Sequence, residues 1–461
     1  MDIKKIVIAG ASGYIGKSLI PKLIAKFPNA EITALSRSKQ KSKHKQVTWV
    51  ACDLFSLKSI EEAVPGDVDL AFYLVHSMGP TAQLDQGSFA DYDLILADNF
   101  ARTLKATKIQ QLIYLGGLLP DSEDLSLHLK SRLEVESVFN SFNLPLTIFR
   151  AGLILGESGS SFQILLKLVK RLPVMICPAW TQSLTSPVGL DTVLTVLTDS
   201  ASRLECIRRI YDIAGCRPLS YLSMMKETAR KIKKKRLFFK VPFFTPTLSR
   251  LWVCLVTGSS KNLVYPLVES LKHEMVARKD RLYPNLNVDR TYFDLLDLAI
   301  HKDYKERKFH AFKAQSKTVR SVQRLSLPKG KDATWSIDKY MTWLPRYLAP
   351  FIKVNSFENS IEFSLFFKKW VFLGLKKGPL RSDSTRQLLY ITNGLLVDQK
   401  NRGRLEFREV LSKKYIIAAI HDYKPSLPWF VYVFTQAKIH LWVMRAFSKY
   451  MKKYETKSQK N

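Results

Sequence analysis

Three glycines near the start of the chain have the spacing that phosphate chemistry requires. Gly10, Gly13 and Gly16 follow the apolar run 6–9 in a G-x-x-G-x-x-G pattern. Glycines of this kind let the backbone approach a pyrophosphate, and the helix that follows offers unpaired N–H groups and a positive dipole end. The sequence predicts a dinucleotide site whose pyrophosphate is held by Gly10, Ser12, Gly13, Tyr14, Ile15 and Gly16. The alternative is a tight turn in a doubly wound domain that binds no nucleotide.

The segment Ser36-Arg37-Ser38-Lys39 bears on which dinucleotide is bound. An NAD site usually has an acidic residue about 20 residues after the glycine turn, where it contacts the ribose 2′-hydroxyl. This segment has no carboxylate there, and a guanidinium can clamp a 2′-phosphate with two hydrogen bonds. The sequence therefore favours NADP(H) over NAD(H), with Arg37 on the 2′-phosphate. A solvated basic loop is the alternative.

The glycine turn needs a parallel sheet to position it, and the pattern of the first 115 residues predicts one. Apolar strand-like runs alternate with segments of helical periodicity, which is typical of a sheet covered on both faces. The predicted fold class is α/β, a Rossmann doubly wound parallel sheet, and ligands are expected at the carboxyl ends of its strands. The expected strands are 6–9, 31–37, 47–54, 70–75 and 112–115, and the expected helices are 17–24, 57–64 and 90–107.

Composition places the chain among intracellular globular proteins with an anionic partner. It has 461 residues, enough for two or three domains, and a formal net charge of +32. Such a charge favours nucleic acid, a phospholipid surface or acidic ligands. The five cysteines form no C-x-x-C pair, which is typical of a reduced protein without a zinc site, so we expect no metal. No uncharged apolar run reaches about 18 residues, the length that a membrane-spanning helix needs.

Several strand-end motifs together resemble the atypical branch of the short-chain dehydrogenase/reductase superfamily, of the NmrA-like and YbjT type. The resemblance covers residues 1 to about 325. It implies that Asp53 and Leu54 contact the adenine and that Leu74 and His76 line the path of the cofactor. The motifs that carry it are GASGYIG at 10–16, CDL at 52–54, YLVHSM at 73–78, YLGGL at 114–118 and FRAGLILG at 149–156.

The same resemblance places the catalytic residues of the superfamily on the helix at 125–139, and here the sequence departs from it. Active members use a Tyr-x-x-x-Lys pair, whose spacing puts both side chains on one helix face. The matching positions are His128 and Arg132, and the position of the superfamily's serine is Gly116 or Gly117. Histidine can serve as a general acid or base, so His128 is the candidate proton donor and Arg132 the candidate ribose contact. The alternative is that both form the polar face of a helix covering the cofactor.

The segment 226–240 combines Lys and Arg with the aromatic pair 238–239 and leads into the apolar run 241–244. Basic and aromatic residues together are typical of nucleic-acid grooves and of membrane-surface segments. The continuous apolar runs favour lipid over nucleic acid, and a solvated basic face is the third alternative. We expect a cytoplasmic protein, placed on the inner face of the membrane if the lipid interpretation holds.

The chain is expected to divide into four regions. They are an NAD(P)-binding domain at 1–215, a substrate-side extension at 216–300, a basic linker at 301–332 and an α+β domain at 333–461. In the last region, strands are expected at 361–366, 386–392, 403–410 and 414–420, and a helix at 435–454 with an apolar stripe expected to pack on the sheet. Strands followed by one long helix resemble the helix-grip fold of polyketide-cyclase and lipid-transfer proteins.

Two functions follow from these expectations. The first is an NADP(H)-dependent oxidoreductase that acts on a lipid- or quinone-like substrate near a membrane surface. The second is a non-catalytic NADP(H) sensor or assembly factor, with the C-terminal domain as its ligand or partner module. His128 separates them, because only an oxidoreductase needs its proton chemistry.

Overall fold

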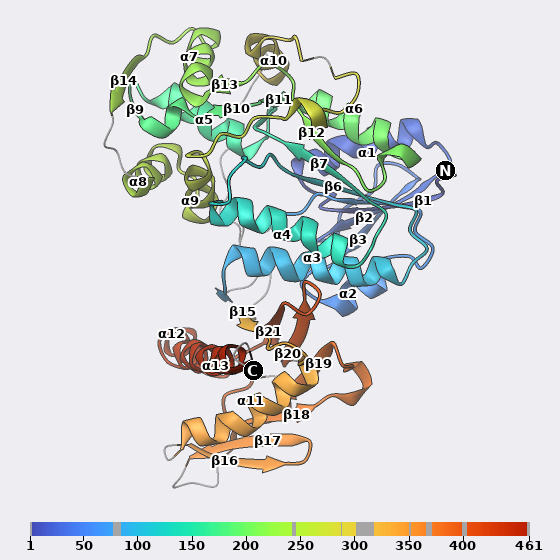
Figure 1. Cartoon of the computed structure of the whole chain (residues 1–461), viewed down its shortest axis with the longest axis vertical. Coiled ribbons are helices and arrows are strands. Elements are labelled where there is room, and N and C mark those ends of the chain that lie inside the picture. Colours follow the sequence, from blue (N-terminus) through green and yellow to red (C-terminus); the bar gives the residue numbers. More distant parts are fainter. Residues whose placement is uncertain are drawn as a thin grey trace. The chain divides into compact units, whose positions relative to one another are not determined.

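A computed structural model describes residues 2–76, 84–241, 246–286, 288–300, 318–349, 352–365, 371–398 and 403–458 (Figure 1). The chain forms two compact units, each drawn from two stretches of sequence. The first comprises 1–79 and 96–311, and the second comprises 80–95 and 312–461. The predicted motif residues Ser77 and Met78, the apolar residues 242–245 and the first part of the predicted linker, 301–317, lie outside the described residues.

The first unit is built on a seven-stranded parallel sheet, which confirms the predicted Rossmann architecture. Its strand order is β12-β7-β6-β4-β1-β2-β3, and all six neighbouring pairs run parallel. The strands in the middle of the sheet are buried along most of their length, as expected when helices cover both faces. The strands are β1 Lys5–Ala9, β2 Glu31–Ser36, β3 Val47–Ala51, β4 Leu70–Tyr73, β6 Gln111–Gly117, β7 Leu146–Ala151 and β12 Ile210–Ile213.

Helices lie over both faces of this sheet. Figure 1 shows α1 and α6 over one face and α3 and α4 over the other. Buried Leu19 and Leu23 of α1 and Val193 and Leu197 of α6 belong to one apolar cluster with the sheet. The helices are α1 Tyr14–Lys26, α2 Leu57–Ala63, α3 Phe89–Lys105, which belongs to this unit from residue 96 on, α4 Leu127–Ser141 and α6 Leu190–Ser200.

Residues between about 152 and 300 add a second layer of short elements to the first unit. Three two-stranded ribbons join β8 to β11, β9 to β14 and β10 to β13. A separate apolar cluster connects α5, α7 and α10, so the predicted extension at 216–300 packs within this unit. The elements are β8 Ile154–Leu155, α5 Ser160–Arg171, β9 Val174–Pro178, β10 Leu184–Thr185, β11 Val188–Gly189, β13 Leu219–Ser220, α7 Tyr221–Lys231, β14 Leu237–Val241, α8 Pro246–Thr257, α9 Lys261–Ser270 and α10 Tyr292–Ala299.

The second unit is an α+β region, as predicted, built on an eight-stranded sheet of order β16-β17-β18-β19-β20-β21-β15-β5. Neighbouring strands are antiparallel except that the edge strand β5 runs parallel to β15. The strands are β5 Leu84–Gln86, β15 Val319–Ser326, β16 Ile352–Phe357, β17 Ser360–Leu365, β18 Val371–Lys377, β19 Arg386–Ile391, β20 Arg404–Val410 and β21 Tyr415–Tyr423.

The predicted linker at 301–332 needs correction, because Val319–Ser326 is strand β15 of this sheet. Its polar residues misled the interpretation, since alternation in a sheet strand can leave Lys, Arg and Ser on the polar side. Arg324, for example, pairs through Nε with Asp91 Oδ1 at 2.9 Å. The second unit therefore starts before residue 333.

Three helices pack against this sheet: α11 Ala333–Leu348, α12 Trp429–Phe434 and α13 Gln436–Ser458. The apolar stripe of α13 lies in the core, as expected. Val443, Met444, Phe447 and Met451 are buried together with side chains of the sheet, and the Phe447 ring packs edge-on to that of Phe407 on β20. The resemblance to a helix-grip fold stays a prediction.

Candidate functional site

The glycine turn follows β1, the strand at which the strand order of the parallel sheet reverses, with β2 on one side of it and β4 on the other. Strands β1 and β4 are neighbours, and the chain leaves β1 for α1 on one face and β4 for α3 on the other. Ligands of doubly wound sheets bind in the crevice at this switch point. Here the two strand ends touch, because the Leu74 N–H donates to Ala9 O at 3.0 Å.

Steric crowding explains why glycine is required in this turn. Gly10 has a φ of 86°, and a Cβ at this position would lie 2.8 Å from Leu74 O. A Cβ on Gly16 would lie 2.5 Å from Gly10 O and 2.7 Å from the Ala11 Cα. Gly13 caps α1 without a side chain, and the first turn of α1 has no acidic residue. The N-terminus of α1 therefore has the close-packed backbone, free of side-chain caps, that the predicted pyrophosphate site requires.

The ring of Tyr14 lies against Gly156 rather than over the turn. Burial raises the pKa of its phenol, with hydrogen bonds from the backbone of Ser158 and Glu157 acting in the opposite direction. The phenol therefore fixes the loop after β8. The backbone N–H of Tyr14 remains the part of this residue suited to the predicted phosphate contact.

The residues predicted for the adenosine half of the cofactor follow the next two strands of the same sheet. Arg37 comes directly after β2 and is exposed. Asp53 follows β3, and its Oδ1 accepts from the N–H of Phe55 at 3.1 Å. The carbonyl of Leu54 accepts from Asn99 Nδ2 at 2.8 Å. Because β1, β2 and β3 are parallel neighbours, these residues share one edge of the sheet with the glycine turn.

His76 and His128 meet at this edge, although 52 residues separate them. Their Nε2 atoms lie 2.9 Å apart, and the rings are stacked with centroids 5.1 Å apart. His76 extends from the end of β4, and His128 from the first turn of α4. The sequence singled out both residues, but nothing in the spacing indicated that they form a pair.

Ser270, at the C-terminal end of α9, supports His128 from the other side of the ring. Its Oγ lies 3.1 Å from His128 Nδ1 and 2.9 Å from Ser126 Oγ. The Ser270 hydroxyl also donates to Pro266 O at 2.9 Å. Because the Ser270 hydroxyl donates its one proton to Pro266 O, its oxygen can only accept from His128 Nδ1. We therefore place a proton on His128 Nδ1. Sequence reasoning missed Ser270, because a serine on a distant helix carries no local signal.

Arg132 is buried beneath this site, only 3% exposed. Its Nε donates to Tyr114 OH at 2.9 Å, and Nη1 lies 3.4 Å from Val75 O. The guanidinium also stacks on the Tyr114 ring at 5.4 Å. Through Val75 O, Arg132 contacts the strand end that carries His76, and its predicted contact with ribose stays a prediction.

The strand end that would supply the superfamily's serine has open space beside it. A Cβ at Gly117 would meet nothing within 4 Å, whereas one at Gly116 would lie 3.0 Å from the Tyr114 ring. A serine side chain would therefore fit at position 117 more easily than at position 116.

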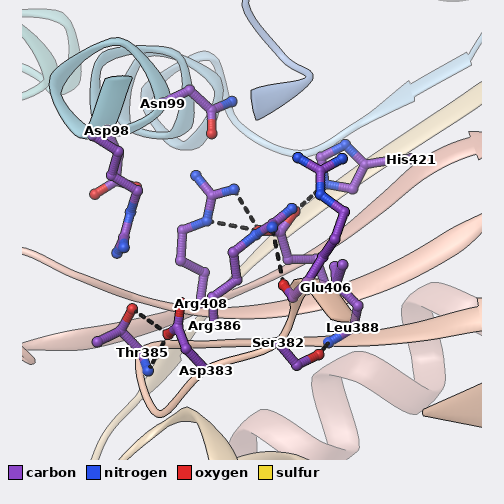
Figure 2. Close-up of polar contacts among 12 residues, drawn as sticks. Asp98, Asn99, Ser382, Asp383, Thr385, Arg386, Leu388, Glu406, Arg408 and His421 are labelled. Carbon is purple, nitrogen blue, oxygen red and sulfur yellow. Dashed lines mark hydrogen bonds and ion pairs between the residues drawn. The ribbon is translucent and has the colours of Figure 1, made fainter. Parts of the chain in front are cut away.

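A second polar cluster, in the C-terminal unit, is buried and held together by ion pairs among its own side chains (Figure 2). Glu406 Oε1 accepts from Arg386 Nε at 2.5 Å and from Arg408 Nε at 2.7 Å, and its Oε2 lies 2.7 Å from His421 Nε2. Burial alone would raise the pKa of Glu406, but Arg408, His421 and Arg386 outweigh it and hold the pKa well below its ordinary value. The cluster ties β19, β20 and β21 together, so we assign it to the sheet and not to a ligand.

The fold and the glycine turn define a dinucleotide-binding Rossmann domain, and the comparisons with known proteins agree. A family described as NAD(P)H-binding matches residues 10–164. Residues 10–164 are therefore similar to NAD(P)H-binding domains, and the parallel sheet of the first unit has the Rossmann architecture of such domains.

Two solved structures share this fold at low sequence identity. Triphenylmethane reductase from Citrobacter sp., complexed with NADP(H), is 15% identical with a TM-score of 0.51, over 64% of this chain and 100% of that one. A nucleoside-diphosphate-sugar epimerase from Staphylococcus aureus is 11% identical with a TM-score of 0.50, over 64% and 99%.

A curated relative is the auxiliary protein GraX of Staphylococcus aureus (strain NCTC 8325 / PS 47). It is 32% identical over 123 residues, which are 26% of this chain. The match spans 39% of the relative's own length.

Within the described ranges, no helix is both long and apolar enough to cross a membrane. The same ranges contain no group of three or more His, Cys, Asp or Glu side chains arranged to hold a metal ion.

Proposed function

We propose that this protein is an NADP(H)-dependent oxidoreductase acting on a hydrophobic, lipid- or quinone-like carbonyl substrate. The observation that carries the proposal is the His76–His128 pair, placed at the same sheet edge as the glycine turn. When bound there, the nicotinamide cofactor would supply or accept the hydride. The chain's residues would bind it, with the turn on the pyrophosphate and Arg37 on the 2′-phosphate.

The histidine pair supports proton transfer to a substrate oxygen. Because Ser270 holds a proton on His128 Nδ1, the two Nε2 atoms at 2.9 Å share one further proton when the pair is neutral. If the pair took up one more proton, one ring would become an imidazolium, and its Nε2–H would donate to the Nε2 of the other, neutral ring. Such a pair can donate a proton as a carbonyl oxygen gains charge and recover it from solvent through exposed His76.

A non-catalytic NADP(H) sensor or assembly factor is the second candidate. The observation in its favour is the loss of all three residue types that do the chemistry in active members: Gly116 or Gly117, His128 and Arg132 stand in their places. The match to an auxiliary protein also supports it. In that case the second unit would serve as the ligand or partner module.

Titration with NADPH and NADH tests the cofactor assignment. We expect tighter binding of NADPH, and Arg37→Ser should reduce that preference by about tenfold or more, because a charge-assisted bidentate contact is lost. Lys41→Ser, on the same exposed loop, is the matched control. Equal affinity for both dinucleotides before and after the Arg37 change would contradict the NADP(H) assignment.

His128→Ala then separates the two candidates. An oxidoreductase would lose turnover of a quinone or an apolar aldehyde while still binding NADPH. Ser270→Ala should shift the pH profile of turnover, because the Nδ1 proton of His128 loses its acceptor. A chain that binds NADPH but reduces none of a panel of such carbonyls supports the sensor instead.

A further inference from the structure

The ribbon formed by β9 and β14 carries exposed apolar side chains on its outer face. The parallel register pairs Leu237 with Val174 and Phe239 with Ile176. These four side chains are 61%, 45%, 55% and 47% exposed, respectively. The alternate residue Met175 is 3% exposed and belongs to the core cluster beneath. The ribbon therefore has one face in the core and one continuous apolar face in water, which is unusual for large apolar residues.

Helix α8 adds three more exposed apolar side chains next to this ribbon. Leu251, Trp252 and Leu255 are 46%, 41% and 78% exposed. Both elements are fixed to the C-terminal end of α5. Arg236, which precedes β14, donates to Val169 O at 2.7 Å and to Lys170 O at 2.8 Å, and Arg171 donates to Val256 O at 2.7 Å.

Basic residues lie on α7, in the loop before β14 and on β14 itself, and they divide into two kinds. The basic residues on α7 have acidic partners, since Arg230 pairs with Glu227 at 2.5 Å and Lys231 pairs with Asp297. The lysine run 233–235 and Lys240 are exposed, and within the described residues they make no ion pair. These lysines therefore keep their full charge available for an external anion.

We propose that the outer face of the β9–β14 ribbon, with the exposed side of α8, docks on an anionic phospholipid surface. At a membrane interface, exposed apolar side chains can insert among the acyl chains, while lysines without acidic partners can contact the anionic headgroups. Leu, Ile, Val and Phe side chains offer no hydrogen bonds to nucleobases and Trp offers only its indole N–H, whereas an acyl layer accommodates all five. The proposal does not depend on the cofactor or on turnover, and it explains how an apolar substrate would reach the protein.

Vesicle co-sedimentation tests the proposal with the full chain. The protein should bind vesicles of 30% phosphatidylglycerol in phosphatidylcholine at low salt and bind pure phosphatidylcholine much more weakly. Changing the run 233–235 to Gln should lower the partition coefficient by about 100-fold, because each lysine near an anionic surface contributes about fivefold. The matched control changes three exposed lysines elsewhere in the first unit, Lys22, Lys105 and Lys108, to Gln.

The apolar face requires its own variant. Leu237→Ser with Phe239→Ser should lower binding by at least tenfold, while Leu204→Ser, at a residue 67% exposed elsewhere in the same unit, should leave it unchanged. Unchanged NADPH affinity would show that each variant folds. Indifference to anionic vesicles at low salt would overturn the proposal. So would equal losses in the lysine variant and its control, or an RNA affinity that depends on the lysines and not on the apolar pair.

Discussion

His421 makes the stability of the C-terminal unit depend on pH. Its side chain is 1% exposed, and burial lowers its pKa from 6.5 to about 4, with Arg404 and Arg408 acting in the same direction and Glu406 against them. Between these values the unfolded chain binds a proton that the folded chain does not. Stability must therefore rise with pH across this window and fall on acidification.

The expected loss between pH 7 and pH 5 is about 2 kcal/mol, and roughly 3 kcal/mol once the pH has fallen below 4. His421→Gln should abolish this loss, because glutamine stays neutral and its amide can still donate to Glu406. Hydrogen exchange of peptides covering Arg404–Val410 and Tyr415–Tyr423, corrected for intrinsic rates, measures the effect locally. His44→Gln, at an exposed histidine of the other unit, is the control.

The opposite outcome is equally measurable. If the Glu406 carboxylate kept His421 charged, its pKa would lie above 6.5 and acidification would protect these strands instead. Equal pH dependence in His421→Gln and the unchanged chain would also refute the reasoning.

Three further changes test the first unit. Gly16→Ala should abolish NADPH binding by calorimetry, because its Cβ would lie 2.5 Å from a backbone oxygen, whereas Gly66→Ala has open space and should bind normally. Glu136→Gln should destabilise the unit by about 3 kcal/mol in urea unfolding, because it leaves Arg150 buried without a carboxylate partner; a loss below about 1 kcal/mol would show that the pair is dispensable. Gly117→Ser has room for its side chain and should change the free energy of unfolding by less than about 0.5 kcal/mol.

The parallel sheet was predictable because its signals are local. Apolar strands between helices with 3.6-residue periodicity gave β1 to β4 and β6 within a few residues of their observed bounds. The glycine turn was equally predictable, because the backbone around positions 10 and 16 leaves no room for a side chain larger than that of glycine. For these strands, helices and the turn, the residues that determine the structure lie within the same short stretch of sequence.

The features that the sequence did not indicate depend on pairing between distant segments. Strand β5 has three residues and is a strand because it pairs with β15, which lies more than 230 positions away in the sequence. Ser270 acquires its role from His128 in the same way. Arg132 was assigned to the ribose because it matches the superfamily's lysine position, whereas its contact with Tyr114 on β6 depends on a distant element.

The short strand β5 has a genetic consequence. Because 80–95 belongs to the second unit and 96–311 to the first, neither unit is one uninterrupted stretch of chain. A stop codon after residue 311 would leave Leu84–Gln86 without the strand it pairs with, and a chain starting at 312 would lack its own sheet edge. A single truncation or a single crossover point therefore cannot separate the chain into two intact units.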